Sequence, residues 1–359
     1  MTTNTSVGIL GVGIHLPSEI RKNDWWPESV VRSWGERTNL VRPEHSKDDA
    51  QTEGARRTLE AMASYKGDAF KGAIERRVMP KGVNPSDMEV AAGDDAIKRS
   101  GVAKSDIDLL MVFSQLPDHL LTPNAPLVHR QLGLNRNCLS LDTHSACNSF
   151  LVQFALAEQM IKSGQARNAL LIQSSTCSAI SLPEDHHSAW FGDAATAVLV
   201  GPVSEGKGAL SWSHRTDGSF HLALVGGKPG ARWWEADRTV LYTPDRQCAR
   251  NMLLLIADLA KEVIDEALLR SGHQPMDVDF YATHQSTYWF RKVTQEYMGL
   301  KRAKSFDSFA WTGSLAACNI PFMLGMGERE GTLKDGDLVA MYTGGTGITW
   351  TGQTMRWGR

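Results

Sequence analysis

Short apolar runs alternate along this chain with longer stretches in which apolar residues recur at helical spacing. The helical pattern is clearest at residues 88–100, which end at Gly101, and at 123–132. The apolar runs predict buried strands at residues 7–17, 107–113, 169–173, 195–200 and 278–283. Because strands alternate with helices, the pattern predicts an α/β fold with a mostly parallel sheet covered on both faces.

One strand-to-helix junction carries a cysteine. Residues 139–141 predict a short buried strand, and residues 150–161 predict a buried helix that ends near Gly164, which leaves Cys147 on the turn between them. The free N–H groups and the dipole of a helix N-terminus favour thiolate, the nucleophilic form that attacks thioesters. On these residues alone, the alternative is a cysteine that serves as a small buried apolar side chain.

The second half of the chain repeats the first. Residues 96–110 align with 267–281, and the same offset places Ala146-Cys147-Asn148 on Ala317-Cys318-Asn319. Two matches in one register predict two similar α/β halves packed against each other. Ligands of such sheets bind beyond the carboxyl ends of the strands, so the two halves bring their strand ends together at the junction.

A histidine stands at such a strand end in the second half. His284 directly follows the predicted strand 278–283, so we expect it opposite Cys147 as a candidate base. A structural role for His284 remains the alternative, and His144, His186 and His187 compete for the catalytic one.

Residues 21–73 differ in composition from their surroundings. They are rich in Trp, Glu, Arg, Asp and Lys and show helical spacing near residues 58–65. We interpret them as a helical insertion that acts as a lid or a dimer arm, or else as a solvated surface subdomain.

Composition and charge exclude several classes of protein. The formal net charge of −2 argues against a nucleic-acid surface. No apolar run is long enough to cross a bilayer, and the first residues lack the pattern of a signal peptide. Five cysteines without a Cys-x-x-Cys pair indicate neither a disulfide framework nor a zinc site, so we expect a reducing cytoplasm.

Four motifs in order carry a family resemblance. Asp142-Thr143-His144-Ser145-Ala146-Cys147-Asn148-Ser149-Phe150, Phe191-Gly192-Asp193-Ala194-Ala195-Thr196-Ala197-Val198, Thr283-His284-Gln285-Ser286 and Gly344-Gly345-Thr346-Gly347-Ile348-Thr349-Trp350 resemble those of the β-ketoacyl-acyl-carrier-protein synthase III family, which has the thiolase fold. The resemblance covers about residues 5–20 and 74–359 and does not place the insertion.

The resemblance implies a five-layered α-β-α-β-α thiolase fold. Residues 1–200 would form the half that carries the cysteine, interrupted by the insertion at about 21–73, and residues 201–359 the half that carries the histidine. The resemblance also implies a cytoplasmic homodimer that takes acyl groups from acyl-coenzyme A or an acyl carrier protein. Coenzyme A or phosphopantetheine would enter as part of the substrate, with no metal and no resident cofactor.

The family's catalytic roles transfer to particular residues. By resemblance, Cys147 receives the acyl group, His284 acts in the second step, and the backbone N–H groups of Cys147 and Thr346 form the oxyanion hole. The chain departs from the family where an Asn follows a Gly, because Gly313 is followed here by Ser314. We expect Ser314 at this third catalytic position, which leaves acylation intact and weakens malonyl decarboxylation.

Three functions fit these residues. The first is a Claisen-type C–C condensation in polyketide or specialised metabolism, the second acyl transfer to an alcohol or amine, and the third a catalytically weak subunit that stabilises a partner synthase. Thr287 is a candidate substrate contact. Candidate basic residues for the substrate or a carrier protein are Arg76, Arg77, Lys81, Arg291 and Lys292.

Overall fold

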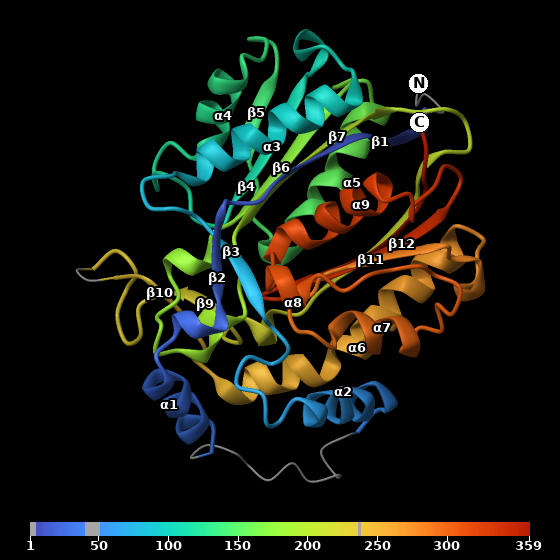
Figure 1. Cartoon of the computed structure of the whole chain (residues 1–359). Helices are drawn as coiled ribbons and strands as arrows, with labels where there is room; N and C mark the ends of the chain where they lie inside the picture. Colours follow the sequence, from blue (N-terminus) through green and yellow to red (C-terminus); the bar gives the residue numbers. More distant parts are fainter. Residues whose placement is uncertain (1–4, 40–50, 236–237) are drawn as a thin grey trace.

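The computed structural model describes residues 5–39, 51–235 and 238–359. Two mixed sheets lie face to face with two helices between them and helices on both outer sides (Figure 1). Helices α3 (Pro85–Ser100) and α4 (Asn124–Leu132) cover the first sheet, and α6 (Arg246–Arg270) and α7 (Phe290–Tyr297) cover the second. The central layer is formed by α5 (Ser149–Lys162) and α9 (Asn319–Arg329). The arrangement confirms the five-layered α-β-α-β-α fold.

The first sheet has the strand order β1-β7-β6-β4-β5. Strand β4 runs parallel to β5 and β6, whereas β7 is antiparallel to both β6 and β1. The strands are β1 (Val7–His15), β4 (Leu109–Ser114), β5 (Leu139–Asp142), β6 (Ala169–Ser175) and β7 (Ala194–Pro202).

The second sheet repeats this order as β8-β13-β12-β11. An isolated parallel bridge between Phe280 and Lys304 occupies the place of a fifth strand beside β11. The strands are β8 (Gly208–Thr216), β11 (Phe280–Thr283), β12 (Leu338–Gly345) and β13 (Thr349–Arg356). The matching orders confirm the two similar halves, with β7 ending at Pro202 and β8 beginning at Gly208.

The expectation of a mostly parallel sheet is wrong. Only β11 and β12 are parallel in the second sheet, and the first contains two antiparallel pairings. The cause is the connection between β12 and β13, since three residues can join only antiparallel neighbours. The equivalent strands β6 and β7 also follow each other without an intervening α-helix.

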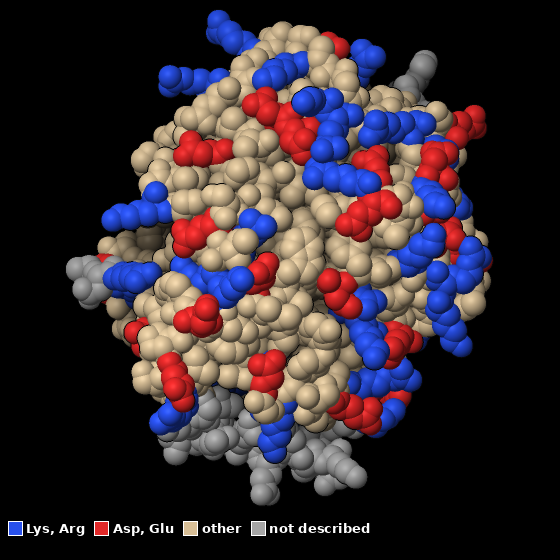
Figure 2. Space-filling view, in the orientation of Figure 1, with Lys and Arg blue, Asp and Glu red and all other residues tan. Residues whose placement is uncertain are grey.

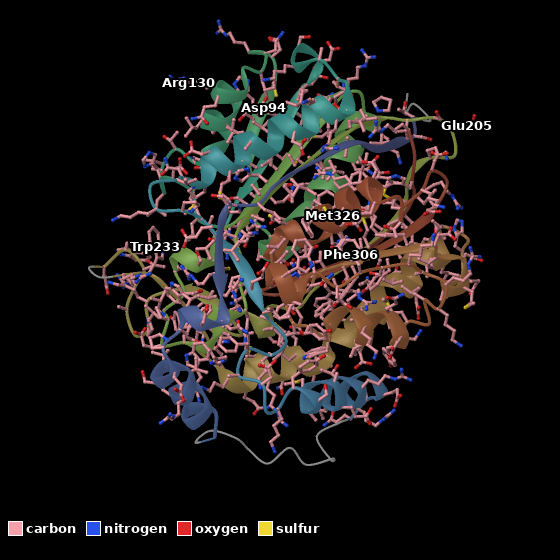
Figure 3. All side chains as sticks on the ribbon, viewed as in Figure 1. Asp94, Arg130, Glu205, Trp233, Phe306 and Met326 are labelled. Carbon is pink, nitrogen blue, oxygen red and sulfur yellow. The ribbon has the colours of Figure 1, made fainter. Side chains whose placement is uncertain are left out.

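The central helices are apolar on more than one face because each packs against both sheets. Phe150 and Phe154 of α5 and Met323 and Leu324 of α9 belong to one buried cluster with strand residues of both halves. Figure 3 labels Met326 of α9 and Phe306, which pack against a smaller cluster containing Cys318 and Phe322. Both central helices therefore hold their N-termini rigidly at the junction of the halves.

The insertion leaves and rejoins the fold through an antiparallel ribbon of β2 (Glu19–Lys22) and β3 (Glu75–Val78). It contains α1 (Glu28–Asn39) and α2 (Glu53–Ser64), and α2 packs on the outer side of α6 (Figure 1). Part of the predicted insertion, residues 40–50, lies outside the described residues.

The remaining elements are short. A second ribbon joins β9 (Val225–Gly227) and β10 (Val240–Tyr242), and α8 (Phe309–Thr312) precedes α9. Single 3-10 turns are η1 (Asn23–Trp25), η3 (Lys104–Asp106), η4 (Ala146–Asn148), η5 (Cys177–Ala179), η6 (His186–Ala189), η7 (Gly218–Phe220), η8 (Pro275–Asp277) and η9 (Ala316–Cys318). Within the described ranges, no helix has the length and apolar character needed to span a bilayer.

Candidate active site

Cys147 lies on turn η4, between β5 and the N-terminus of α5. The residue before it, Ala146, has a φ of 49°, a left-handed conformation that costs free energy for a residue with a side chain. The turn is held by the second half, since Thr343 Oγ1 donates to the Cys147 carbonyl at 3.2 Å and Asn148 Nδ2 donates to Thr351 Oγ1 at 3.0 Å. Cys147 is thereby positioned by both halves.

The resting thiol differs from the expected thiolate. Burial raises the pKa of Cys147 to about 12, because the loss of water disfavours the charged form more than a backbone hydrogen bond to the sulfur favours it. The side chain is only partly accessible. Cys147 therefore rests as a thiol, and it has to lose its proton as the substrate carbonyl is attacked.

His284 directly follows β11 and is 6% exposed. Its backbone N–H donates to the Tyr342 carbonyl at 3.0 Å, and its ring meets Phe290 edge to face at 5.6 Å. Burial lowers the pKa of His284 to about 4, so the imidazole is neutral at physiological pH.

One cavity of about 1030 Å³ contains both groups. Its lining is largely apolar and comes from both halves and from the insertion. Besides Cys147 and His284, the wall includes Phe113, His144, Cys177, Phe309 and Thr346 near the central turns, and Met62, Tyr65, Met252, Ile256 and Leu259 of α2 and α6. A cavity of this size and character accommodates a flexible apolar chain.

The predicted oxyanion turn reaches the nucleophile. A Cβ on Gly345 would lie 2.3 Å from the Ser145 carbonyl oxygen, so only glycine permits this approach of β12 to η4. Thr346 follows and lines the cavity.

Ser314 does not reach the cavity. It is fully buried, it pairs as an isolated bridge with Phe191, and its Oγ accepts a hydrogen bond of 3.4 Å from the Ala316 N–H. Its own N–H donates to the Trp190 carbonyl at 2.7 Å. The structure therefore does not bring Ser314 together with Cys147 and His284.

Asn319, for which the sequence predicted no role, lies beside the histidine. Its Nδ2 lies 2.9 Å from His284 Nδ1, and both side chains are buried. The sequence offered one signal for a role of Asn319, which is its polar side chain at the start of the otherwise apolar segment 319–324.

The repeat register is corrected by one residue. Ala316 has a φ of 47° and opens η9, as Ala146 opens η4, so the counterpart of Cys147 is Ala317 and not Cys318. The thiol of Cys318 instead contacts the Gln173 carbonyl at 3.3 Å in the protein interior. The alignment of the two turns differs by one residue from the alignment of the strands. The repeat in the sequence followed the strands and for that reason pointed to Cys318.

The candidate substrate-binding residues Thr287, Arg76 and Arg77 lie in different places. Thr287 lines the cavity, and its buried Oγ1 has no hydrogen-bond partner within the part of the chain that the structure describes. Arg76 is 1% exposed and donates to the Ala189 carbonyl at 2.7 Å, which contradicts a substrate contact. Arg77 donates to the Pro17 carbonyl at 3.3 Å and lies outside the cavity lining.

Some of the tryptophans line the cavity, and others pack elsewhere in the protein. Trp233, at the side of the molecule beside β9 and β10, and Trp234 line the cavity (Figure 3). Trp26 and Trp34 pack instead with Phe70 in a separate buried cluster of the insertion. Trp311 packs against Phe322.

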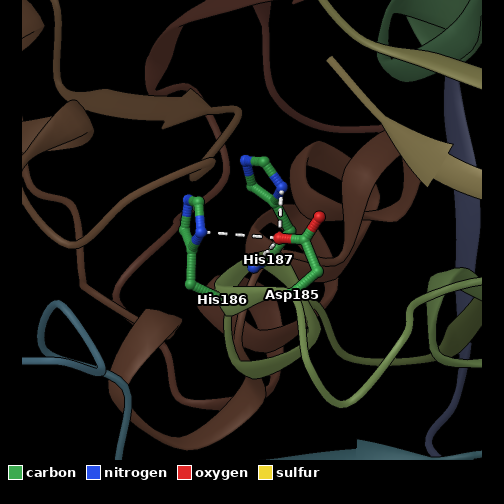
Figure 4. Close-up of side chains that lie close together, drawn as sticks. All are labelled: Asp185, His186 and His187. Carbon is green, nitrogen blue, oxygen red and sulfur yellow. Dashed lines mark hydrogen bonds and ion pairs between the residues drawn. The ribbon is translucent and has the colours of Figure 1, made fainter. Parts of the chain in front are cut away.

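Asp185, His186 and His187 form a cluster beside the cavity, which His187 lines. One carboxylate oxygen of Asp185 lies 2.9 Å from His187 Nδ1 and 3.5 Å from His186 Nδ1 (Figure 4). The ligand atoms are close enough to hold a metal ion. Burial and the positive charges of Lys71 and Arg246, however, lower the pKa of His186 to about 4, and these charges oppose a cation at the same place.

The chain is similar in sequence to known proteins. Sequence models of 3-oxoacyl-[acyl-carrier-protein] synthase III and of its C-terminal region match residues 141–218 and 268–357. The beta-ketoacyl-[acyl-carrier-protein] synthase III of Bacillus pumilus is 32% identical over 291 residues, 80% of this chain and 88% of that protein. A synthase III of Bacillus cereus is 30% identical over 289 residues, with coverages of 80% and 88%.

Solved structures show the same fold. FabH of Pseudomonas aeruginosa, a 3-oxoacyl-(acyl carrier protein) synthase III, superposes with a TM-score of 0.77 at 22% identity and covers 99% of both chains. Cerulenin-bound OleA of Xanthomonas campestris gives 0.79 at 19% identity, covering 98% of this chain and 97% of its own. With the identity to the Bacillus proteins, these findings show that the chain belongs to the 3-oxoacyl-[acyl-carrier-protein] synthase III family of acyl-transferring condensing enzymes.

Proposed function

We propose that the enzyme loads an acyl group from a coenzyme A or carrier-protein thioester onto Cys147 and passes it to a carbon nucleophile of a second substrate. The observation that carries this proposal is the position of Cys147 and His284 on one largely apolar cavity. In the first step, Sγ bonds to the thioester carbonyl carbon, the original C–S bond breaks, and the departing thiol takes up the proton that Cys147 loses.

The tetrahedral intermediate of this step carries a negative oxygen. We assign its stabilisation to the backbone N–H groups of Cys147 and Thr346, supported by the close approach of Gly345 to turn η4. In the second step, the attacking carbon of the second substrate gives up a proton or carbon dioxide and bonds to the acyl carbon. The bond between Cys147 Sγ and the acyl carbon breaks, and Sγ leaves as a thiolate that takes up a proton. His284 acts on the second substrate, and Thr287, with its unpartnered hydroxyl, contacts a polar group of either substrate.

The acyl chain belongs among the apolar side chains of α2 and α6. A variant OleA with bound lauric acid and lauroyl-CoA superposes with a TM-score of 0.78 at 18% identity, covering 98% of this chain and 99% of its own. This neighbour and the lining of Met62, Met252, Ile256 and Leu259 support a medium or long acyl chain. We propose specialised metabolism, such as polyketide formation, because by the resemblance Ser314 stands where the family has an Asn.

The proposed donor is an acyl-coenzyme A or an acyl carrier protein. The relatives' names refer to the carrier protein. On the face shown in Figure 2, basic and acidic side chains are intermixed, and the basic ones do not gather into one large patch. Arg291, an earlier candidate for carrier binding, is paired with Asp307 at 2.6 Å. Docking on that face would therefore depend on individual charges.

We also propose a homodimer. Strand β5 is the edge of its sheet, and its Leu139 is 54% exposed. Leu120 lines the cavity and yet is 72% exposed. A second copy on this edge would cover Leu139 and satisfy the free strand edge.

Intact-protein mass spectrometry with a panel of acyl-coenzyme A and acyl-carrier thioesters tests the function. A mass increase that Cys147→Ala abolishes and Cys318→Ala retains would support it. Malonyl, β-ketoacyl, alcohol and amine acceptors are then added to the loaded enzyme. Release as an ester or amide would replace the C–C condensation by transfer to oxygen or nitrogen, and no loading from any donor would favour the role of a partner subunit.

A further inference from the structure

The amide of Asn319 has only one orientation that satisfies its backbone neighbours. The Leu315 N–H lies 3.4 Å from Oδ1, and the Ala316 carbonyl oxygen lies 3.1 Å from Nδ2. An N–H only donates and a carbonyl only accepts, so Oδ1 must face Leu315 and Nδ2 must face Ala316. Reversing the amide would lose both hydrogen bonds in a site that is 1% exposed.

This orientation determines which nitrogen of His284 carries the proton. Nδ1 of His284 lies 2.9 Å from Asn319 Nδ2 and 3.3 Å from the Ala316 carbonyl oxygen. The amide nitrogen has hydrogens and no acceptor capacity, so the shorter contact requires Nδ1 to accept. A neutral imidazole that accepts at Nδ1 carries its proton at Nε2, and burial keeps His284 neutral.

The duplicated half offers an internal control. Ser149 occupies the position in the first turn that Asn319 occupies in the second, since each begins the helix after its 3-10 turn. Ser149 Oγ accepts from the Ser145 N–H at 3.0 Å and donates to the Ala146 carbonyl at 2.7 Å. A serine hydroxyl thus meets both backbone groups with its single hydrogen. The second hydrogen of the Asn319 amide is not needed for the turn and is directed at His284.

We propose that Asn319 is a positioning residue that fixes His284 as the Nε2–H tautomer. This inference rests on the proposed function in one respect, the identity of the atom that Nε2–H meets. In that reaction, Nε2–H donates a hydrogen bond to the thioester oxygen of the second substrate as the carbanion develops. His284 then does not act as the general base predicted from the sequence.

Nitrogen NMR of the resting protein tests the tautomer without any substrate. Protein labelled with ¹⁵N-histidine gives separate signals for protonated and unprotonated ring nitrogens, and His284→Gln identifies those of His284. We expect Nε2 protonated and Nδ1 unprotonated. A protonated Nδ1 would overturn the proposal, whatever the enzyme's substrates prove to be.

Asn319→Ser separates positioning from support of the turn. The hydroxyl retains the contacts that Ser149 makes, while the donor to His284 is lost. We expect loading of Cys147 to stay within about twofold and transfer to the second substrate to slow on the order of tenfold to a hundredfold. Full transfer with an unchanged tautomer would contradict the proposal.

Asn319→Asp gives a sharper signature, because a carboxylate only accepts and pulls a proton onto Nδ1. Transfer should then be weak at high pH, where Nε2 has no proton, and recover at lower pH as the imidazole becomes doubly protonated. Cys318→Ala, next to Asn319 but directed at Gln173, is the matched control and should show the tautomer and pH profile of the native protein. A flat profile for Asn319→Asp would overturn the assignment.

Discussion

Turns η4 and η9 are two copies of one structure with different chemistry. Each begins with an alanine at positive φ, 49° at Ala146 and 47° at Ala316, and each is followed by a central helix. The residue after the alanine is Cys147 in one copy and Ala317 in the other. At the helix start, Ser149 makes two backbone contacts, whereas Asn319 makes the same two and reaches His284. The fold therefore contains the same turn twice, and the two copies differ in chemistry through single side chains.

The ends of the equivalent strands β4 and β11 also carry side chains of different chemistry. The register that aligns residues 96–110 with 267–281 places Phe113 of β4 at the position of His284. Both line the cavity. In the proposed reaction, the first half thus contributes the nucleophile and an apolar wall, and the second contributes the polar group that acts on the other substrate.

The substitution with the largest expected effect removes the chemical difference between turns η4 and η9. Cys147→Ala gives both copies an alanine, so covalent loading should disappear, because the thiol that receives the acyl group is removed. Mass spectrometry after incubation with an acyl thioester checks this. Acylation that persists in Cys147→Ala and is lost in Cys318→Ala would reverse our assignment of the nucleophile.

His284→Ala should leave loading in place and slow transfer from the loaded enzyme by about a hundredfold to a thousandfold, the usual loss when one donor to a developing oxyanion is removed. Single-turnover transfer from preloaded enzyme measures this step alone. If loading falls as much as transfer, His284 serves the first half-reaction as well.

Gly345→Ala should disturb the first turn and spare the second. The added Cβ would lie 2.3 Å from the Ser145 carbonyl, so β12 or η4 must move, at a cost of about 1–3 kcal/mol in the free energy of unfolding. Loading should slow as well. Gly344→Ala is the control, because its Cβ would have no neighbour closer than 3.7 Å. Equal denaturation midpoints for the two variants would contradict the close approach.

The pKa of His284 predicts the pH dependence of stability. The folded value of about 4 lies below the ordinary 6.5, so between these values the unfolded chain binds a proton that the folded chain does not. The free energy of unfolding should therefore decrease as pH falls through this window. Urea titrations at several pH values measure it, and His284→Gln should lack this component. Transfer should stay constant through pH 6.5, and a loss there would show an exposed imidazole.

Ser314→Ala should have the smallest effect. Its hydroxyl lies outside the cavity lining and accepts one long hydrogen bond, so we expect about 1 kcal/mol or less in stability and an almost unchanged turnover. Steady-state kinetics beside Asn319→Ser check this. Slow transfer in Ser314→Ala alone would restore Ser314 to the third catalytic position.

Much of this site was predictable because it lies at the ends of regular elements. His284 directly follows β11, Cys147 lies on the turn after β5, and the apolar runs of both strands are visible in the sequence. The carboxyl ends of such strands converge. The surroundings of Ser314 could not be predicted from the sequence, because they depend on pairing with Phe191, far away in the chain. Arg76 was misjudged because burial by Trp26 and Ala189 depends on how the insertion folds back.

The amino-acid sequence by itself determined the class of fold, the duplication, and the two residues that carry the proposed chemistry, because periodicity and local order are properties of the chain. Only the tertiary structure decided the sheet directions, the thiol state of Cys147, the one-residue correction from Cys318 to Ala317, and the contact between Asn319 and His284. Each of these depends on distances between segments remote in the chain and on the exclusion of water around them, and no local pattern contains either.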